Sequence, residues 1–187
     1  MTTNKILFRE EQKFRVWWLW LILVGAFAVS AGPLWYGVWS QLTTGVPWGD
    51  EPTGDTALVV TTLLVTLLMG GLILLFVLAR LETEITTADI AFRFSPFVRK
   101  WRRIPREMIA RFEAGRYNPI MDYGGWGVRQ SLGKKGKAYN VSGNLGLTLY
   151  LVDGKKLLIG TRRLQAISYA MDNMMKGMPR SEEKRMS

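Results

Sequence analysis

The 187-residue chain contains no cysteine and no histidine. Without cysteine it can form neither a disulfide nor a thiolate nucleophile, and without both residue types it has no Cys/His metal site. General acid–base catalysis near neutral pH would need a carboxylate, lysine or tyrosine with a shifted pKa. These absences count against most hydrolase and metalloenzyme functions, so we expect no catalytic residue, no metal and no cofactor.

Charge is absent from two long segments, residues 16–41 and 57–79. About 20 apolar residues in an α-helix cross the ~30 Å hydrocarbon core of a bilayer, and both segments are long enough to do so. Tryptophan and tyrosine gather near the ends of the first segment, as they do at membrane interfaces. The sequence therefore predicts a membrane-spanning α-helical hairpin with a short loop at residues 42–56.

Lysine and arginine flank these segments unevenly. Residues 1–15 carry four of them and Arg80 follows the second segment, whereas the loop has none and carries three acidic residues. Because cytoplasmic flanks retain Lys and Arg, we expect a multi-pass protein with both termini in the cytoplasm and the loop outside. We expect residues 1–15 to form a cytoplasmic juxtamembrane segment, in which residues 5–15 are either a short amphipathic interfacial helix or an ordinary charged flank.

The first apolar segment also has features of a signal peptide. Val29, Ser30 and Ala31 form a small-residue site that a signal peptidase could cleave. Apolar residues continue past this site to Leu42, however, and the segment begins with tryptophans. We therefore favour an uncleaved span over a cleaved leader, and the intact mass would separate the two.

After residue 79 the pattern changes to short alternating runs, which predict strands. Asp153-Gly154 predicts a two-residue hairpin turn, and an apolar stripe at helical spacing predicts a C-terminal helix. The expected strands cover residues 81–85, 90–95, 97–104, 112–117, 126–129, 138–141, 145–151 and 155–160, and the helix covers residues 162–176. Residues 80–177 should form an α+β or all-β domain, a curved antiparallel sheet or barrel capped by the helix, before a disordered tail at 178–187.

Four short motifs in this domain resemble bacterial pleckstrin-homology-like (PH-like) domains. They are T-x-x-D-I at residues 86–90, R-x-I-P-x-E-x-I at 102–109, the glycine–arginine strand at 127–129 and G-x-x-L-x-I-G-T at 154–161. The resemblance implies a PH-like fold behind two N-terminal spans in a bacterial inner-membrane protein of an uncharacterised family. Eukaryotic relatives bind phosphoinositides through basic residues between the first two strands. The turn at residues 86–89 has none, so that site is not carried over.

A dense cluster of basic residues is the first candidate site. Residues 80–187 hold 21 Lys/Arg and 10 Asp/Glu, a net charge of +11, and an embedded tryptophan would suit an anionic membrane interface. The alternative is a strand with Trp101 facing inward and solvated charges facing outward, and the two are compatible. The cluster comprises Arg99, Lys100, Trp101, Arg102, Arg103 and Arg106.

A glycine-rich run is the second candidate. Tyr123, Trp126 and Arg129 are surrounded by glycines that permit close backbone approach, so they either line a groove for a ligand or peptide or belong to a kinked strand with a core tryptophan. A basic loop with Lys134, Lys135 and Lys137 lacks the spacing of a phosphate-binding loop and indicates a mobile surface loop.

Taken together, these features predict a non-catalytic scaffold that presents a basic domain at the membrane. Its expected partners are the bilayer with its anionic head groups and a protein partner or second copy of the chain, but not nucleic acid. One alternative is an accessory subunit of a larger transport complex. No charged residue inside the spans marks an ion path, so we do not expect this chain to transport ions alone. The other alternative is a membrane-bound enzyme with a site built from Tyr123, Arg129, Asp122 and Glu113, in which a carboxylate pKa would be raised.

Overall fold

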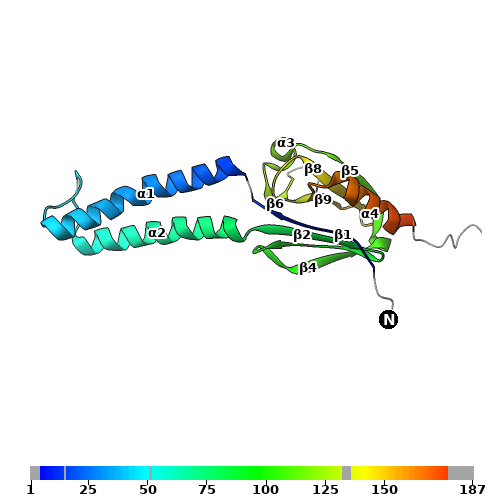
Figure 1. Ribbon diagram of the computed structural model, residues 1–187, viewed down its shortest axis with the longest axis horizontal. Helices are drawn as coiled ribbons and strands as arrows, with labels where there is room; N and C mark the ends of the chain where they lie inside the picture. The colour runs from blue at the N-terminus through cyan, green and yellow to red at the C-terminus, as the bar shows by residue number, and fades with distance from the viewer. Residues whose placement is uncertain (1–4, 15, 51, 132–135, 177–187) are drawn as a thin grey trace, which may run out of the picture. The chain divides into compact units, whose positions relative to one another are not determined.

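The computed structural model describes residues 5–14, 16–50, 52–131 and 136–176. Contacts divide the chain into two compact units, one made of Arg15–Leu78 and the other of Met1–Phe14 with Ala79–Ser187. The expected tail at residues 178–187 lies outside the described residues, as do Lys134 and Lys135 of the basic loop. The ribbon is shown in Figure 1.

The helical unit is a hairpin of α1 (Trp17–Thr44) and α2 (Asp55–Leu78). Both helices are long and apolar enough to span a membrane, as expected. Only 22% and 11% of their most apolar stretches are buried within the chain, whereas the core helix of a soluble protein would be mostly buried. α1 also continues as one helix past the small-residue site at Ala31.

A buried glutamine organises the loop end of this hairpin. The Gln41 side chain donates to the Thr53 carbonyl (3.0 Å) and the Asp55 carboxylate (2.6 Å), and it accepts from the Trp48 N–H (3.0 Å). Trp48 lies so close to Gly37 that a Cβ there would come within 2.5 Å of the indole. The small residue therefore makes room for the ring.

The glycine pair Gly70 and Gly71 differs from Gly37 in that no side chain in the described part of the chain packs against it. These residues allow close packing of the second span in principle, but a Cβ at either would meet nothing within 4 Å. Among the described residues, this pair therefore makes no close contact with α1.

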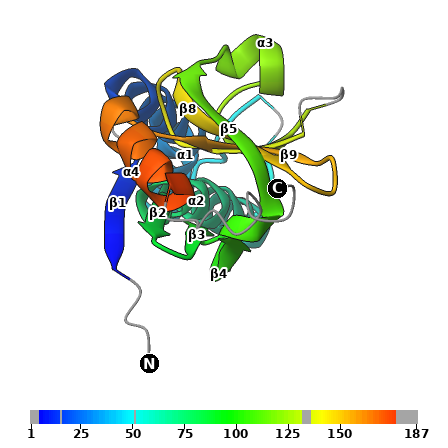
Figure 2. The ribbon, with the colours of Figure 1, turned by 90° about the vertical axis from the view of Figure 1, so that its right-hand side faces the viewer.

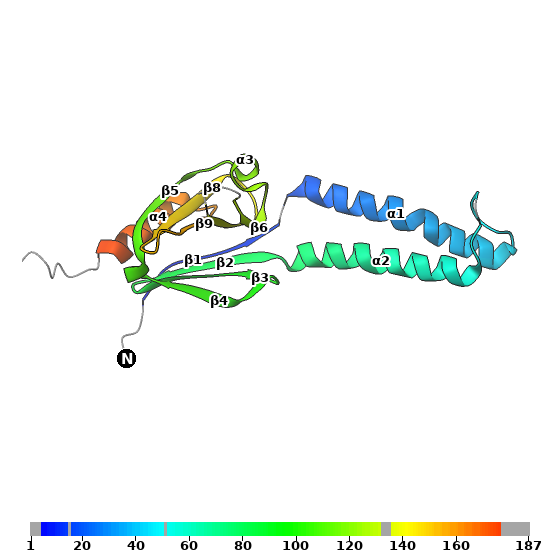
Figure 3. The same ribbon diagram turned by 180° about the vertical axis from the view of Figure 1, so that it is seen from behind.

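The segment before α1 is a strand, which the sequence did not predict. β1 (Ile6–Lys13) pairs antiparallel with β2 (Arg80–Thr86), and Lys13 lies opposite Arg80. The expectation of an interfacial helix or a loose flank at residues 5–15 was wrong. The helical hairpin is thus inserted between two neighbouring strands of one sheet, and Figure 3 shows β1 beside β2.

Two sheets make up the second unit. The four-stranded sheet has the order β1-β2-β3-β4, and the five-stranded sheet has the order β5-β8-β9-β7-β6. Only the β7–β9 pair is parallel among the pairs in the described residues. The remaining elements are β3 (Asp89–Ser95), β4 (Val98–Pro105), η1 (Arg106–Met108), β5 (Ile109–Arg116), α3 (Pro119–Tyr123), β6 (Gly127–Gln130), β7 (Lys137–Asn140), β8 (Leu145–Leu151), β9 (Lys156–Gly160) and α4 (Leu164–Lys176).

The two sheets and α4 share one apolar core. Inward-facing side chains of both sheets meet there, and α4 contributes Ile167, Met171 and Met174, each fully buried. This confirms the predicted helix stripe and the predicted fold class of a helix-capped β domain. α4 contacts β1 and β2 of one sheet and β5 and β8 of the other, so it closes one side between the sheets (Figure 2).

The β8–β9 turn differs from the predicted two-residue type. The Leu151 N–H donates to the Lys155 carbonyl (2.9 Å), so three residues form the loop. The Gly154 N–H donates back to the Leu151 carbonyl (3.0 Å), and Gly154 has φ +79°. A tight turn followed by a left-handed glycine is the usual three-residue hairpin, because only glycine adopts this φ without strain.

Polar residues of β1 tie this strand to the segment that leads into α4. The buried Glu10 carboxylate accepts from the Thr161 hydroxyl (2.6 Å) and the Arg162 N–H (2.9 Å). Gln12 donates to the Gly160 carbonyl at 2.8 Å. The Arg162 guanidinium in turn donates to the Lys13 carbonyl (3.1 Å). These bonds join the first strand of the domain to residues about 150 positions away.

Candidate functional site

β4 separates the predicted basic cluster onto two faces of the four-stranded sheet. Arg102 pairs with Phe92 and Ile104 with Ile90, two core residues of β3, so Arg102 and Ile104 face inward. Arg103 pairs with Ala91 and faces outward. Because successive side chains of a strand alternate between faces, the neighbouring Arg102 and Arg103 lie on opposite faces of the sheet.

The outward half of the cluster is engaged in contacts. Arg103 donates to the Asp89 carboxylate at 2.8 Å. Trp101 lies against the outward-facing Arg93, whose guanidinium carbon is 4.8 Å from the ring centroid. The expectation that Trp101 faces inward was therefore wrong. Because Arg102 lies opposite the inward-facing Phe92, the alternation of the strand places the adjacent Trp101 on the outer face.

Arg93 also holds a carboxylate on this face. It donates through both Nε and Nη2 to Glu82, which is 8% exposed. The hydrogen bond from Arg93 is the main cause that lowers the pKa of Glu82, with additional attraction from Arg93, Arg80 and Arg9 and an opposing effect of burial. Glu82 therefore stabilises the fold in its ionised form.

A pH dependence follows from this pair. A carboxyl group whose pKa is depressed in the folded state contributes its full stability above its ordinary pKa, here 4.5, and loses it as the pH falls through the folded value. We expect Arg93→Met to reduce the loss of stability on acidification below about pH 4.5. Thermal unfolding of both proteins between neutral and acidic pH measures this, and equal acid sensitivity would contradict it.

Arg106 caps the C-terminal end of α4. Its Nη1 donates to the Met174 carbonyl in the last turn of α4 (3.0 Å), which satisfies a helix C-terminal acceptor. Arg99 and Lys100 are exposed at the start of β4, and Arg102 and Arg103 are exposed as well. The predicted cluster thus divides into Arg99 and Lys100 at one end of β4, an inward Arg102, an ion-paired Arg103 and a helix-capping Arg106.

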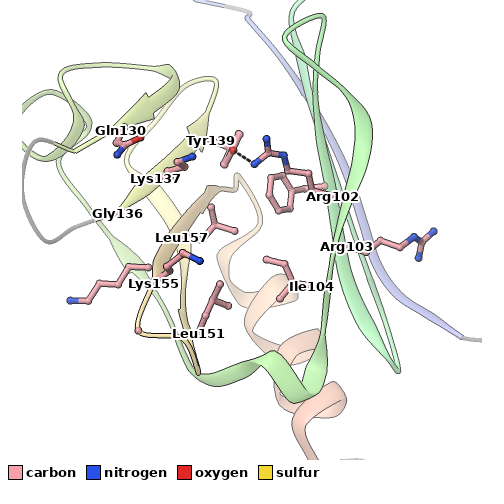
Figure 4. Close-up of a pocket in the computed structure, with 13 residues that line it drawn as sticks. Arg102, Arg103, Ile104, Gln130, Gly136, Lys137, Tyr139, Leu151, Lys155 and Leu157 are labelled. Carbon is pink, nitrogen blue, oxygen red and sulfur yellow. Dashed lines mark hydrogen bonds between the residues drawn. The ribbon is translucent and has the colours of Figure 1, made fainter.

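The inward half of β4 borders a cleft of about 780 Å³. It opens on the side where β4 faces β7 and β9, and Figure 4 shows Arg102 reaching toward Tyr139 while Arg103 points away. The Arg102 guanidinium donates to the Tyr139 hydroxyl (3.0 Å), and Tyr139 packs on Phe92 with ring centroids 4.8 Å apart. The lining residues are Phe92, Arg102, Arg103, Ile104, Gln130, Gly136, Lys137, Tyr139, Leu151, Gly154, Lys155, Lys156 and Leu157.

The cleft has a distinct chemistry. Its lining, taken over the described residues, contains five Lys/Arg and no Asp or Glu. Its apolar side chains come from both sheets. Sequence reasoning missed this site, because Lys137 was assigned to a surface loop and Tyr139 to a brief strand. The available signal was the shared face of Lys137 and Tyr139, two positions apart on one strand.

The second candidate is brought together only in part. Tyr123 and Arg129 line a separate depression of about 610 Å³ with Ile120 and Met121 of α3. Trp126 does not line it and instead donates to the Gly143 carbonyl at 2.9 Å. Trp126 is half-buried and outside the apolar core, so the expected core tryptophan was also wrong.

The carboxylates proposed for an enzyme lie apart. Glu113 on β5 accepts from the Tyr150 hydroxyl at 2.8 Å, and this bond is the main cause that lowers its pKa, with Arg111 adding to it. The expectation of a raised pKa was therefore wrong for Glu113. The Asp122 carboxylate accepts from the Asn118 N–H (2.9 Å) at the start of α3. Asp122 lines the same depression as Tyr123, whereas Glu113 does not line it.

No protein-family model matches this chain, and a search of curated proteins finds no match. Function must therefore be argued from the geometry of the two units and of the cleft.

Proposed function

We propose that this protein is a membrane-anchored, non-catalytic binding protein. In this proposal α1 and α2 cross the bacterial inner membrane, both termini lie in the cytoplasm, and a PH-like domain contacts anionic lipid at the membrane surface. The observation that carries the proposal is the pairing of β1 with β2 on either side of the helical hairpin. The two sheets capped by α4 agree with the fold that the sequence resemblance implies.

Chain connection limits how far the domain can lie from the membrane. Only Ala79 separates α2 from β2, and three residues separate Lys13 from α1. Each residue spans at most about 3.6 Å. Because β1 and β2 are paired, both ends of the hairpin must also lie on one side of any membrane that the helices cross. This supports a domain whose Lys13–Arg80 end stays at the interface.

The exposed residues at that end suit an anionic surface. Arg80 pairs with Ser95, so the β3–β4 turn lies at the same end of the sheet. Phe97 in this turn is 60% exposed and is followed by the exposed Arg99 and Lys100. An exposed aromatic ring beside basic residues favours the interface of an anionic leaflet, where each cation contributes about 1 kcal/mol.

The absence of cysteine allows a clean test. Phe97→Cys and Val152→Cys place one polarity-sensitive dye at two equally exposed apolar sites, 60% and 59% exposed. Val152 lies in the β8–β9 turn. Its N–H donates to the carbonyl of Met108, which follows β4 and therefore lies at the end of the domain away from Phe97. With the full chain in anionic lipid nanodiscs, we expect a blue-shifted dye quenched by spin-labelled lipid at position 97 and a water-like dye at position 152.

Charge removal provides the second arm. Arg99→Gln with Lys100→Gln should weaken the contact by about 2 kcal/mol and reverse much of the blue shift at position 97. Lys155→Gln, at the turn that carries Val152, is the control and should have no effect. Equal spectra at positions 97 and 152, or no response to the double substitution, would refute the proposed surface.

A further inference from the structure

We propose that the cleft between β4 and the β7–β9 pair binds one single-chain anionic lipid. Its carboxylate or phosphate head group would lie between Arg102 and Lys137, and its acyl chain along Phe92, Ile104, Leu151 and Leu157. This site differs from the membrane contact at Phe97 and does not depend on it.

Two cations face the cleft from opposite sheets. Arg102 lies on the inward face of β4, opposite Phe92. Lys137 lies on β7 two positions before the buried Tyr139 and therefore on the same inward face. Figure 4 shows both side chains at the cleft, above its apolar residues. The two sheets thus direct positive charge into one space.

These charges lack an anionic partner in the part of the chain that the structure describes. Arg102 contacts the Tyr139 hydroxyl, and no carboxylate lines the cleft among the described residues. Two other cations of the lining are paired elsewhere, Arg103 with Asp89 (2.8 Å) and Lys155 with Asp153 (2.6 Å). Like charges beside an apolar surface repel, and a bound anion relieves this repulsion.

The floor of the cleft requires an apolar part in the ligand. Phe92 is 1% exposed and Leu157 8% exposed, while Ile104 and Leu151 are half-buried beside them. A volume of about 780 Å³ lies within the range of small-molecule sites. Inorganic phosphate would satisfy the cations but leave the exposed parts of Ile104 and Leu151 in water, whereas an acyl chain would cover them. A protein anchored in a bilayer meets such molecules at high local concentration.

The test uses the full chain in zwitterionic nanodiscs and a photoactivatable fatty acid as the probe. Saturable labelling should map to peptides of β4, β8 and β9. Unlabelled oleate and lysophosphatidic acid should both displace the probe, which covers the two head-group chemistries. Lysophosphatidylcholine, inorganic phosphate and an acidic peptide should not displace it. Displacement by phosphate or by the peptide as effectively as by the anionic lipids would overturn the proposal.

Three variants complete the experiment. Arg102→Gln with Lys137→Gln should raise the half-saturating probe concentration about a hundredfold, because two charge-assisted contacts are lost. Ile104→Trp should block labelling by filling the acyl region. Arg116→Gln with Lys176→Gln removes the same charge at exposed sites elsewhere and should change it less than about twofold.

The outcomes distinguish this site from the membrane contact. If the Arg102/Lys137 double variant labels like the parent, the cleft proposal is wrong. The dye signal at position 97 should stay unchanged in this variant, because Arg102 lies in the second half of β4 and Lys137 lies on β7. Circular dichroism and thermal unfolding of each variant confirm that lost labelling does not reflect lost folding.

Discussion

A fragment beginning at Arg80 will not hold the native fold, although it contains every predicted strand of the soluble domain. Strand β1 contributes Phe8 to the core, where it is 5% exposed, and its burial alone is worth about 2 kcal/mol. Without β1, strand β2 becomes an unprotected edge and the buried Leu81 and Ile85 lose neighbours on one side. We expect residues 80–176 to give a broad amide spectrum and no cooperative unfolding transition.

A short turn in place of the helices should restore the fold. Lys13 and Arg80 are directly paired, so a two-residue Asn-Gly turn can join residues 5–13 to residues 80–176 in the native register. This chain should show dispersed amide resonances and cooperative thermal unfolding. If the fragment without β1 unfolds at the same temperature as the linked chain, β1 is not part of the folding unit.

Glu10→Ala is the point substitution with the largest expected effect. Glu10 is 8% exposed, and its carboxylate accepts two hydrogen bonds, from the Thr161 hydroxyl and the Arg162 N–H. Hydrogen bonds to a charged group contribute about 1.5–3 kcal/mol each, and their loss leaves buried donors without a partner. We expect the free energy of unfolding to fall by about 3 kcal/mol or more, measured by chemical denaturation of the linked chain.

The neighbouring glutamate provides a matched control. Glu11 lies on the same strand but faces outward, and its ion pair with Lys13 has side chains that are 44% and 49% exposed. Exposed pairs contribute less than about 1 kcal/mol, so Glu11→Ala should have a small effect. Glu10→Gln keeps an amide oxygen as acceptor and should fall between the two. Equal stabilities for Glu10→Ala and Glu11→Ala would contradict the role of Glu10.

The helices and most strands could be predicted because their signals are local. An uncharged run defines a span, and alternation defines an amphipathic strand. β1 was missed because two of its three buried inward positions, Glu10 and Gln12, are polar. Their partners are Thr161, Arg162 and Gly160, about 150 residues away. No local pattern contains this information, and the adjacent apolar span suggested a charged flank instead.

The cleft was hidden for a related reason. An apolar Trp101 among arginines suggested an inward tryptophan, but the pairing of Arg102 with Phe92 places Arg102 inside and Trp101 outside. The opposite wall depends on β7 pairing in parallel with β9, a non-local contact. The positions of the basic residues can be read from the sequence. Which of them line the cleft depends on strand register and sheet order.

If α1 and α2 span a membrane as we propose, the position of the helical hairpin between β1 and β2 in the chain couples folding of the sheet to membrane insertion. During synthesis β1 precedes both helices, and its partner β2 follows them. In a chain whose helices cross a membrane, β1 cannot pair with β2 until both helices have inserted. A chain with only one inserted helix would leave β1 and β2 on opposite sides of the bilayer, where they cannot pair. Formation of the four-stranded sheet thereby selects chains with the correct topology.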